Sequence, residues 1–313
     1  MIKTALKIIE RLFANALIFR YKFTPKRDYS NKMLILADFG IGDLIMFLPV
    51  IAAIYKSNKY SIYFKTERAS VIEILKGMFP NSYFISPYKG KNGNAKFIGY
   101  AKSILQYKFG ISLLNLHQLY KSNIKLLVKL NIPTIIGHTR TGNKYNRLWT
   151  HPVEYGSGSE VDENIKLLKP LGLTGNPKLF FKVEPVVLPF RDYDYALIQV
   201  SSYTDSRKDC WDVITFVQKI TENIIFIGSV EEKETAEKII MEFPKKKIVN
   251  MCGKLNIFQT AYTIQKAKEF HCNEGGLAHI ASALNVYASV HVNPKIKTEN
   301  IFHKNLNYIY EKG

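Results

Sequence analysis

A glycine-rich turn near the start of the chain has the residue types of a phosphate-binding or catalytic loop. The segment FGIGD at residues 39–43 lies between an apolar run and a stretch of helical length. Gly40 and Gly42 allow a ligand to approach the backbone closely, and Asp43 falls at the cap or first turn of the helix. Ile45 stands where the dinucleotide pattern GxGxxG needs its third glycine. We therefore expect Asp43 either to cap its helix or to act as a general base for a hydroxyl nucleophile.

A second turn of this kind, NEGGLAH at residues 273–279, also lies between an apolar run and a helical pattern. Gly275 and Gly276, next to Glu274, leave backbone amides free to hold an anion, and the helix dipole adds partial positive charge there. His279 in the first helical turn can donate to the same phosphate, or it can be an ordinary structural histidine. The pair of glycines favours an anion site.

Polar residues that suit a diphosphate follow the apolar run at 195–201: Ser201, Ser202, Arg207 and Lys208. Hydroxyls and cations just beyond a strand can bind phosphate oxygens, although the same residues can form a solvated basic loop. Glu232, after another apolar run, either accepts a hydrogen bond from a ribose hydroxyl or is a first-turn acid favoured by the helix dipole.

The elements that must position these residues alternate between strand and helix along the chain. In the first half we expect strands at 33–38, 61–65, 82–86, 110–116 and 132–138, with helices at 44–57, 68–77, 97–107 and 118–130. In the second half we expect strands at 195–201, 223–229, 246–253, 269–272 and 287–292, with helices at 209–221, 231–243, 256–268 and 276–284. Such alternation predicts parallel sheets with crossover helices, whose ligands bind at the carboxyl ends of the strands.

The chain therefore reads as an α/β protein with two Rossmann-like domains that face a central cleft. We expect four parts: a basic amphipathic helix (1–32), a first Rossmann-like domain (33–185), a second Rossmann-like domain (186–294) and a C-terminal tail helix (295–313). The segments 87–96 and 139–160 are expected to be loops, and long loops at sheet edges usually bind a ligand or move. Together with the first glycine turn they provide further candidate binding residues: Gly40, Gly42, Lys89, Lys91 and Arg140.

Composition limits the classes of protein that fit. The chain has 313 residues with 44 Lys and Arg against 26 Asp and Glu, a formal charge of +18, which indicates an anionic partner. Because 47% of the residues are hydrophobic, disorder, collagen-like repeats and a polytopic membrane protein are excluded. The three cysteines, Cys210, Cys252 and Cys272, form no CxxC pair, so we expect neither a disulfide framework nor a zinc site, and a reducing cytoplasm fits best.

The N-terminal residues 1–22 place cations among apolar residues at helical spacing, without an apolar run long enough to span a bilayer. Residues 1–32 contain eight Lys and Arg and two acids. Residues 1–25 are therefore expected either to dock on the anionic cytoplasmic face of the inner membrane or to pack on their own domain with a solvated basic face. The first alternative predicts a cytoplasmic protein bound peripherally to that membrane.

Three segments together resemble glycosyltransferase family 9, the bacterial heptosyltransferase-like enzymes of lipopolysaccharide assembly: GIGDLIMFLP at 40–49, IIFIGSVEEKETAEKI at 224–239, and the block at 252–286. The resemblance covers roughly residues 33–290 and implies a GT-B fold, an inverting mechanism without metal or cofactor, and a nucleotide-activated sugar, commonly ADP-heptose. It implies that Asp43 is the base, that Lys208 and His279 bind the donor phosphates, and that Glu232 contacts the nucleoside. The family usually has Asp and then Thr or Ser where this chain has Glu274 and Gly275.

The acceptor implied is lipopolysaccharide or a related phosphorylated glycolipid. The resemblance implies that the domain at 33–185, with its candidate loop residues, is the acceptor domain and that the domain at 186–294 binds the nucleotide-sugar donor. Other functions stay open: a nucleotide-sugar epimerase or hydrolase of the same fold, or a non-catalytic family member. A nucleic-acid-binding protein would fit the pI of 9.6, but no helix-turn-helix, RNP or zinc pattern is present. We therefore expect no nucleic-acid partner.

Overall fold

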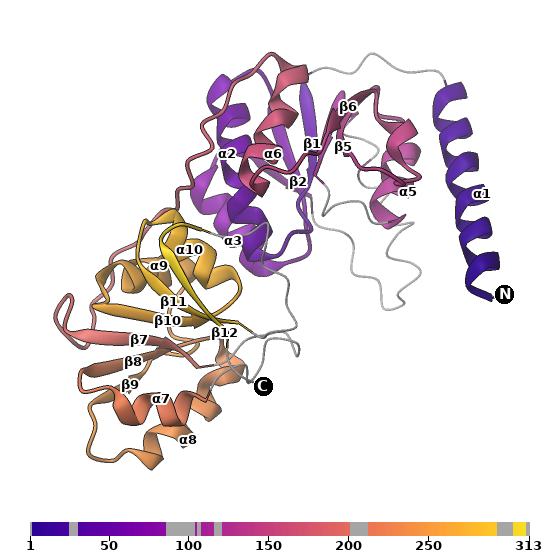
Figure 1. Ribbon diagram of the computed structural model, residues 1–313. Coiled ribbons are helices and arrows are strands. Elements are labelled where there is room, and N and C mark those ends of the chain that lie inside the picture. The colour runs from indigo at the N-terminus through magenta and orange to yellow at the C-terminus, as the bar shows by residue number, and fades with distance from the viewer. Residues whose placement is uncertain are drawn as a thin grey trace. The chain divides into compact units, whose positions relative to one another are not determined.

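Two sheets of parallel strands form the two halves of the chain (Figure 1). The computed structural model describes residues 2–24, 31–85, 104, 108–115, 121–200, 212–292 and 303–310. Within these residues each sheet has six strands. One structural unit comprises residues 1–39 and 47–177, and the other comprises residues 40–46 and 178–313. The predicted α/β fold with two Rossmann-like halves is confirmed.

The first sheet has the order β3-β2-β1-β4-β5-β6. Its strands are β1 (Lys32–Leu36), β2 (Ser61–Lys65), β3 (Tyr83–Ile85), β4 (Ile111–Leu114), β5 (Thr134–Thr139) and β6 (His151–Glu154). The helices of this part of the chain are α1 (Ile2–Phe23), α2 (Ile41–Ser57), α3 (Ala69–Met78), α5 (Lys121–Leu130) and α6 (Glu160–Ile165), with 3-10 helices η2 (Asn146–Leu148) and η3 (Lys166–Leu171). The central β1 is buried from Met33 to Leu36, as a strand covered on both faces must be.

The second sheet repeats this topology with the order β12-β11-β10-β7-β8-β9. Its strands are β7 (Tyr195–Gln199), β8 (Asn223–Ile227), β9 (Ile248–Asn250), β10 (Glu269–Asn273), β11 (Ala288–Val292) and β12 (Leu306–Tyr310). Its helices are α7 (Val213–Lys219), η4 (Val230–Glu232), α8 (Lys233–Glu242), α9 (Ile257–Lys266) and α10 (Gly276–Ala283). The strand order reverses between β7 and β10, and ligands of such sheets bind beyond the carboxyl ends of the strands at this point.

Two edge strands contradict the predicted elements. The C-terminal tail, expected to be a helix, contains β12, which pairs in parallel with β11 from Leu306 to Tyr310 because its tyrosines and isoleucine suit a strand. The expected loop at 139–160 contains β6, η2 and the start of α6. β6 has a proline, Pro152, which a strand tolerates at the edge of a sheet, where one side of the backbone has no neighbouring strand.

The division between the halves also differs from the predicted one at 185/186. The segment that begins at Lys178 belongs to the second unit, as does the short segment 40–46. Glu184 explains the first difference, because its backbone N–H donates to the Phe258 carbonyl at 3.1 Å and its carboxylate accepts from Gln259 at 3.3 Å. The segment around Glu184 is thus tied to α9.

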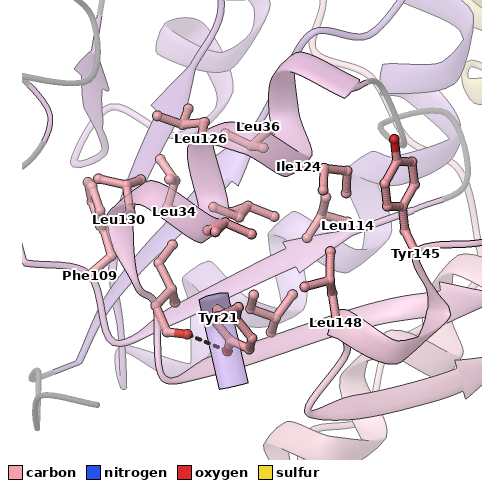
Figure 2. Packing of buried hydrophobic residues seen from close by; sticks show 14 of the residues in the cluster. Tyr21, Leu34, Leu36, Phe109, Leu114, Ile124, Leu126, Leu130, Tyr145 and Leu148 are labelled. Carbon is pink, nitrogen blue, oxygen red and sulfur yellow. Dashed lines mark hydrogen bonds between the residues drawn. The ribbon is translucent and has the colours of Figure 1, made fainter. Parts of the chain in front are cut away.

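The helix α1 packs on the first unit through one of its faces. Ala14, Ile18 and Tyr21, spaced four and three residues apart, are buried against the core that includes Ile124 of α5. The Tyr21 hydroxyl donates to the Ile132 carbonyl at 2.6 Å (Figure 2). Burial raises the pKa of this hydroxyl to about 12. The prediction that the N-terminal helix packs on its own domain is therefore confirmed for this face.

Candidate functional site

The first glycine turn leads into α2, with Asp43 in the first helical turn. The half-buried Asp43 carboxylate accepts a hydrogen bond from the Gly40 backbone N–H at 3.3 Å. This contact is the predicted helix-capping interaction. Its length exceeds the 2.7–2.9 Å usual for charge-assisted bonds, so the cap is a weak one and is compatible with proton transfer at the same carboxylate.

The second glycine turn leads from β10 into α10. Gly275 is the N-cap of α10 and gives the helix no side-chain cap, so the first-turn amides have no capping oxygen from that position. The preceding Glu274 is buried, and its backbone N–H donates to the His291 carbonyl of β11 at 3.1 Å. The pKa of Tyr308 on β12 is raised to about 12, chiefly by burial and to a smaller extent by the charge of Glu274.

The two glycine turns contact each other within the second unit. A Cβ atom on Gly42 would lie 2.5 Å from Cδ2 and 2.8 Å from Nε2 of His279. A Cβ atom on Gly276 would lie 2.8 Å from Cβ of Ile41. Real Cβ contacts are not this short, so a larger residue at either position would force the neighbouring side chain to shift. The structure therefore brings the start of α2 and the start of α10 together, and Asp43 comes one residue after the glycine that faces His279.

The other edge of the buried His279 ring faces His303. Nδ1 of His279 lies 2.8 Å from Nε2 of His303, with the rings edge to face at a centroid distance of 5.0 Å. Burial lowers the pKa of His303 to about 4. His303 precedes β12, and its backbone N–H donates to the Tyr308 hydroxyl at 3.3 Å. The sequence analysis did not identify His303 or Tyr308 as candidates, because it predicted a helix in this part of the chain.

Glu232 has the structural role that was one of its two predicted roles. It closes a capping box with Ser229 at the start of η4, where the Ser229 backbone N–H donates to its carboxylate. Gly228 lies beside the Glu232 side chain, and the Gly253 N–H donates to the Gly228 carbonyl at 3.0 Å. The capping box holds the carboxylate at the end of β8. Its role toward a nucleoside stays a prediction.

The remaining predicted site residues are less informative. Arg140 is exposed, and its backbone carbonyl accepts from the Asn146 side chain at 2.9 Å. The other six lie outside the described residues: Lys89, Lys91, Ser201, Ser202, Arg207 and Lys208. Their roles stay predictions.

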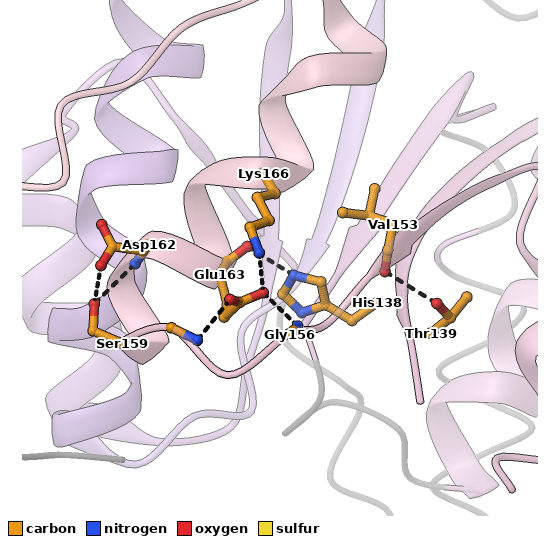
Figure 3. Close-up of polar contacts among 9 residues, drawn as sticks. His138, Thr139, Val153, Gly156, Ser159, Asp162, Glu163 and Lys166 are labelled. Atoms are coloured by element: carbon orange, nitrogen blue, oxygen red, sulfur yellow. Dashed lines mark hydrogen bonds and ion pairs between the residues drawn. The ribbon is translucent and has the colours of Figure 1, made fainter. Parts of the chain in front are cut away.

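A buried carboxylate in the region that was predicted to be a loop was also missed by the sequence reading (Figure 3). Glu163 of α6 accepts from the Gly156 N–H at 2.7 Å, the Gly158 N–H at 3.0 Å and Lys166 Nζ at 2.7 Å. The Glu163 carbonyl lies 3.0 Å from Nε2 of His138 on β5. Burial acts to raise the pKa of Glu163, but the hydrogen bonds from Lys166 and the glycine amides outweigh it and lower the pKa. This cluster orders the loop after β6.

An ion pair joins the carboxyl ends of two neighbouring strands. Lys65, the last residue of β2, lies 2.6 Å from Asp38, just beyond β1. The two strands pair in parallel with Leu36 beside Lys65. The sequence does contain a signal for this contact, because residues at the ends of adjacent parallel strands meet at one edge. Asp38 is thus paired with a cation. Asp43 lies further along the chain, in the first turn of α2.

The described part of the chain contains neither a metal-binding cluster nor a helix that could span a membrane. No group of three or more His, Cys, Asp or Glu residues there could hold a metal ion. Among the same residues no helix combines the length and the apolar character needed to cross a bilayer. Cys252 and Cys272 are buried free thiols.

The second half of the chain is similar in sequence to a known family of enzymes. The sequence model of glycosyltransferase family 9 (heptosyltransferase) matches residues 195–288, from β7 to the first residue of β11. This match confirms the predicted resemblance to that family and the predicted class of enzyme, a glycosyltransferase. No curated protein matches the chain in sequence.

Solved structures share the fold at low sequence identity. A glycosyltransferase family 9 protein from Veillonella parvula DSM 2008 has a TM-score of 0.68 at 13% identity, over 91% of this chain and 88% of that one. Heptosyltransferase WaaC of E. coli, solved with ADP-2-deoxy-2-fluoro heptose, has a TM-score of 0.66 at 14% identity, over 89% and 92%. The UDP-GlcNAc 2-epimerase of Methanocaldococcus jannaschii has a TM-score of 0.54 at 13% identity, over 89% and 88%. The fold is therefore of the GT-B type that was predicted.

Proposed function

We propose that this protein is an inverting, metal-independent glycosyltransferase. It moves a sugar, of the heptose type, from a nucleoside diphosphate donor to a phosphorylated glycolipid acceptor of the lipopolysaccharide kind. The family match over 195–288 supports the reaction class. The E. coli neighbour solved with ADP-2-deoxy-2-fluoro heptose makes an ADP-sugar the first donor to test.

One observation carries this proposal: the contact between Gly42 and His279. It sets a carboxylate in the first turn of α2 close to the start of α10, where backbone amides and a histidine can hold a phosphate. α10 follows β10, which borders the point of reversed strand order in the second sheet. A base and an anion site are thus neighbours in the region where this fold binds its ligands.

The proposed step uses this geometry directly. Asp43 takes the proton of the acceptor hydroxyl while the hydroxyl oxygen attacks the anomeric carbon of the donor. The bond from that carbon to the diphosphate breaks on the opposite face, so the configuration inverts. The nucleoside diphosphate leaves with the electron pair and is stabilised by the α10 amides, His279, Arg207 and Lys208. Because these cationic and N–H donor groups neutralise the leaving group, we propose that no metal takes part.

Ser201 and Ser202 add hydroxyl donors to the diphosphate, and Glu232 binds the nucleoside. On the acceptor side, the basic loops with Lys89, Lys91 and Arg140 attract the phosphates of the glycolipid. These roles are the parts of the proposal that the sequence pattern alone supports.

We also propose that the protein works in the cytoplasm, bound peripherally to the inner membrane through α1. The face of α1 opposite its buried one exposes Leu12, Phe19 and Phe23, with exposed fractions of 63%, 64% and 72%. Arg20 and Lys22 are exposed on the same last turns. Apolar side chains flanked by cations suit the boundary of an anionic leaflet, where a lipid-linked acceptor would be presented.

The donor assignment is tested by thermal unfolding with ADP, GDP, UDP and CDP, followed by transfer assays with the matching sugar. A nucleotide at a hundred times its dissociation constant adds about 2.7 kcal/mol to stability, so binding is readily seen. Transfer that persists in EDTA is expected. The proposal is contradicted if none of the four nucleotides raises the melting temperature, and metal independence is contradicted if EDTA abolishes transfer.

A second candidate function is that of a nucleotide-sugar epimerase or hydrolase. It is considered because the fold is similar to that of a UDP-GlcNAc 2-epimerase. Consumption of the donor without any acceptor would favour this candidate over transfer. Nucleotide binding without turnover of any sugar would instead favour a non-catalytic protein.

A further inference from the structure

His303 contacts the ring of His279 that the proposed function places on the donor phosphate. The contact joins Nε2 of His303 to Nδ1 of His279 at 2.8 Å, a hydrogen-bond distance. The ring planes stand at 88° to each other, in an edge-to-face arrangement. The opposite edge of His279, with Nε2, faces Gly42. His279 is therefore held between a backbone that leaves no room for a side chain and a second imidazole.

The hydrogen bond limits the protonation states of the pair. One proton lies between the two nitrogens, so the two cannot both donate and cannot both accept. Burial lowers the pKa of His303 to about 4, and His303 is therefore neutral near pH 7. If His303 donates from Nε2, neutral His279 has its own proton on Nε2. If His303 accepts, His279 has a proton on Nδ1 and can take a second one on Nε2 to become a cation.

In the first arrangement neutral His279 donates from Nε2. In the second arrangement Nε2 donates only after His279 takes up this second proton, which a neighbouring anion favours. The backbone of His303 is also held by two hydrogen bonds. Its N–H donates to the Tyr308 hydroxyl, and its carbonyl accepts from the Leu306 N–H at 3.1 Å. The strand β12 thus fixes the position of His303 from the edge of the sheet.

We propose that His303 is a positioning residue for the donor site, holding the His279 imidazole in orientation and keeping its Nε2 proton directed at the diphosphate of the bound nucleotide. This inference rests on the proposed function. His303 acts through His279 and does not itself touch the donor.

The test compares nucleotide affinity of the full chain in His303→Phe, His303→Gln and His279→Phe. Phe keeps a ring and removes the nitrogen, whereas the Gln amide can restore a polar atom near the position of Nε2. We expect His303→Phe to weaken ADP binding about tenfold, the effect of losing one hydrogen bond to a charged group, and to lower turnover at saturating donor by less. His303→Gln should recover most of the affinity. His151→Phe, at an exposed histidine of β6, is the matched control and should bind as the wild type does.

Two further readouts separate positioning from folding. In the double variant His279→Phe with His303→Phe, ADP should bind no more weakly than in His279→Phe alone, because His303 acts only through His279. In the wild type, ¹⁵N NMR of the histidine rings with ADP bound should show a proton on Nε2 of His279 and a neutral His303 at pH 7. The NMR result holds even if a variant fails to fold.

The outcomes are distinct for the two proposals. Wild-type affinity in a folded His303→Phe, additive losses in the double variant, or an unprotonated Nε2 of His279 in the ADP complex would overturn the role of His303 and leave the glycosyltransferase proposal standing. If the wild-type protein binds none of ADP, GDP, UDP and CDP, both proposals are overturned.

Discussion

Gly42 in the first turn of α2 and His279 in the first turn of α10 are in direct contact, and a Cβ on Gly42 would lie 2.5 Å from Cδ2 of the histidine. The histidine cannot simply move away, because its Nδ1 is 2.8 Å from His303. The contact links the two segments that the sequence marks for chemistry.

Replacing Gly42 with alanine tests this contact. In most helices the change is stabilising by about 1 kcal/mol, because alanine favours the helix. Here we expect the overpacking to cost about 1–3 kcal/mol of unfolding free energy and to weaken nucleotide binding. Urea unfolding measures the first effect and calorimetric titration with ADP the second. In a His279→Ala background the same substitution should be neutral or stabilising, and an equal loss there would show that the ring is not what Gly42 accommodates.

Replacing Asp43 with asparagine separates the base from the cap. Asparagine can still accept from the Gly40 N–H, so we expect the melting temperature and donor affinity to stay close to those of the wild type. Turnover should fall by about two to four orders of magnitude, the scale of general-base loss. Steady-state kinetics measures this fall.

Asp162→Asn is the control for that experiment. Asp162 is likewise a first-turn acid, in α6, where it accepts from Ser159 Oγ at 2.5 Å. We expect wild-type turnover from this variant. Near wild-type turnover from Asp43→Asn would rule out Asp43 as the base.

Replacing both Phe19 and Phe23 with serine tests the proposed membrane face of α1. The rings of these residues are 4.4 Å apart and both are exposed, so the change leaves the buried face intact. We expect binding to anionic vesicles to fall about tenfold or more, since each phenylalanine contributes on the order of 1 kcal/mol at the lipid boundary. Co-sedimentation with phosphatidylglycerol vesicles measures it.

The matched control replaces exposed apolar residues of the second half, Val230 and Met241, with serine. It should bind vesicles as the wild type does. Deleting residues 1–25 is a poorer test, because the deletion also removes Tyr21 and the other core contacts of α1. Unchanged co-sedimentation of the Phe19 and Phe23 double variant would refute docking through this face.

The pH dependence of the unfolding free energy should reveal the contribution of the Glu163 carboxylate. Its folded-state pKa lies below the ordinary 4.5 because of hydrogen bonds from Lys166, Gly156 and Gly158, which outweigh burial. The unfolded state therefore binds a proton first, and the stability due to this carboxylate is fully present above pH 4.5 and is lost as pH falls through the lower folded-state pKa.

Glu163→Gln should consequently be less stable than the wild type by about 1–3 kcal/mol at pH 7, and the difference should shrink toward pH 3. Urea midpoints between pH 7 and pH 3 measure the trend. Glu154→Gln, at an exposed glutamate of β6, should follow the wild type at every pH. A difference for Glu163→Gln that does not change with pH would mean that the charge of Glu163 is not what stabilises the loop.

Much of the fold was predictable because the signals are local. A parallel strand that is buried on both faces must be apolar throughout, and the run from Met33 to Leu36 is such a strand. Glycines followed by an acid or a histidine marked the first turns of α2 and α10, which contain Asp43 and His279. The reason is the same, because turn and cap geometry depends on adjacent residues. The edge strands β6 and β12 were not predicted, because Pro152 and the tyrosines near the C-terminus give no continuous apolar run.

Local patterns of residues were enough to predict two α/β halves with two glycine turns that suit a base and a phosphate, resembling a glycosyltransferase. The three-dimensional contacts were not predictable in this way: the two turns touch, Glu232 closes a capping box, and His303 binds His279. The physical reason is that residue spacing encodes helices, strands and turns over a few positions. The contacts of Gly42, His279 and His303 arise instead from strand pairing and core burial, which join segments far apart in the chain.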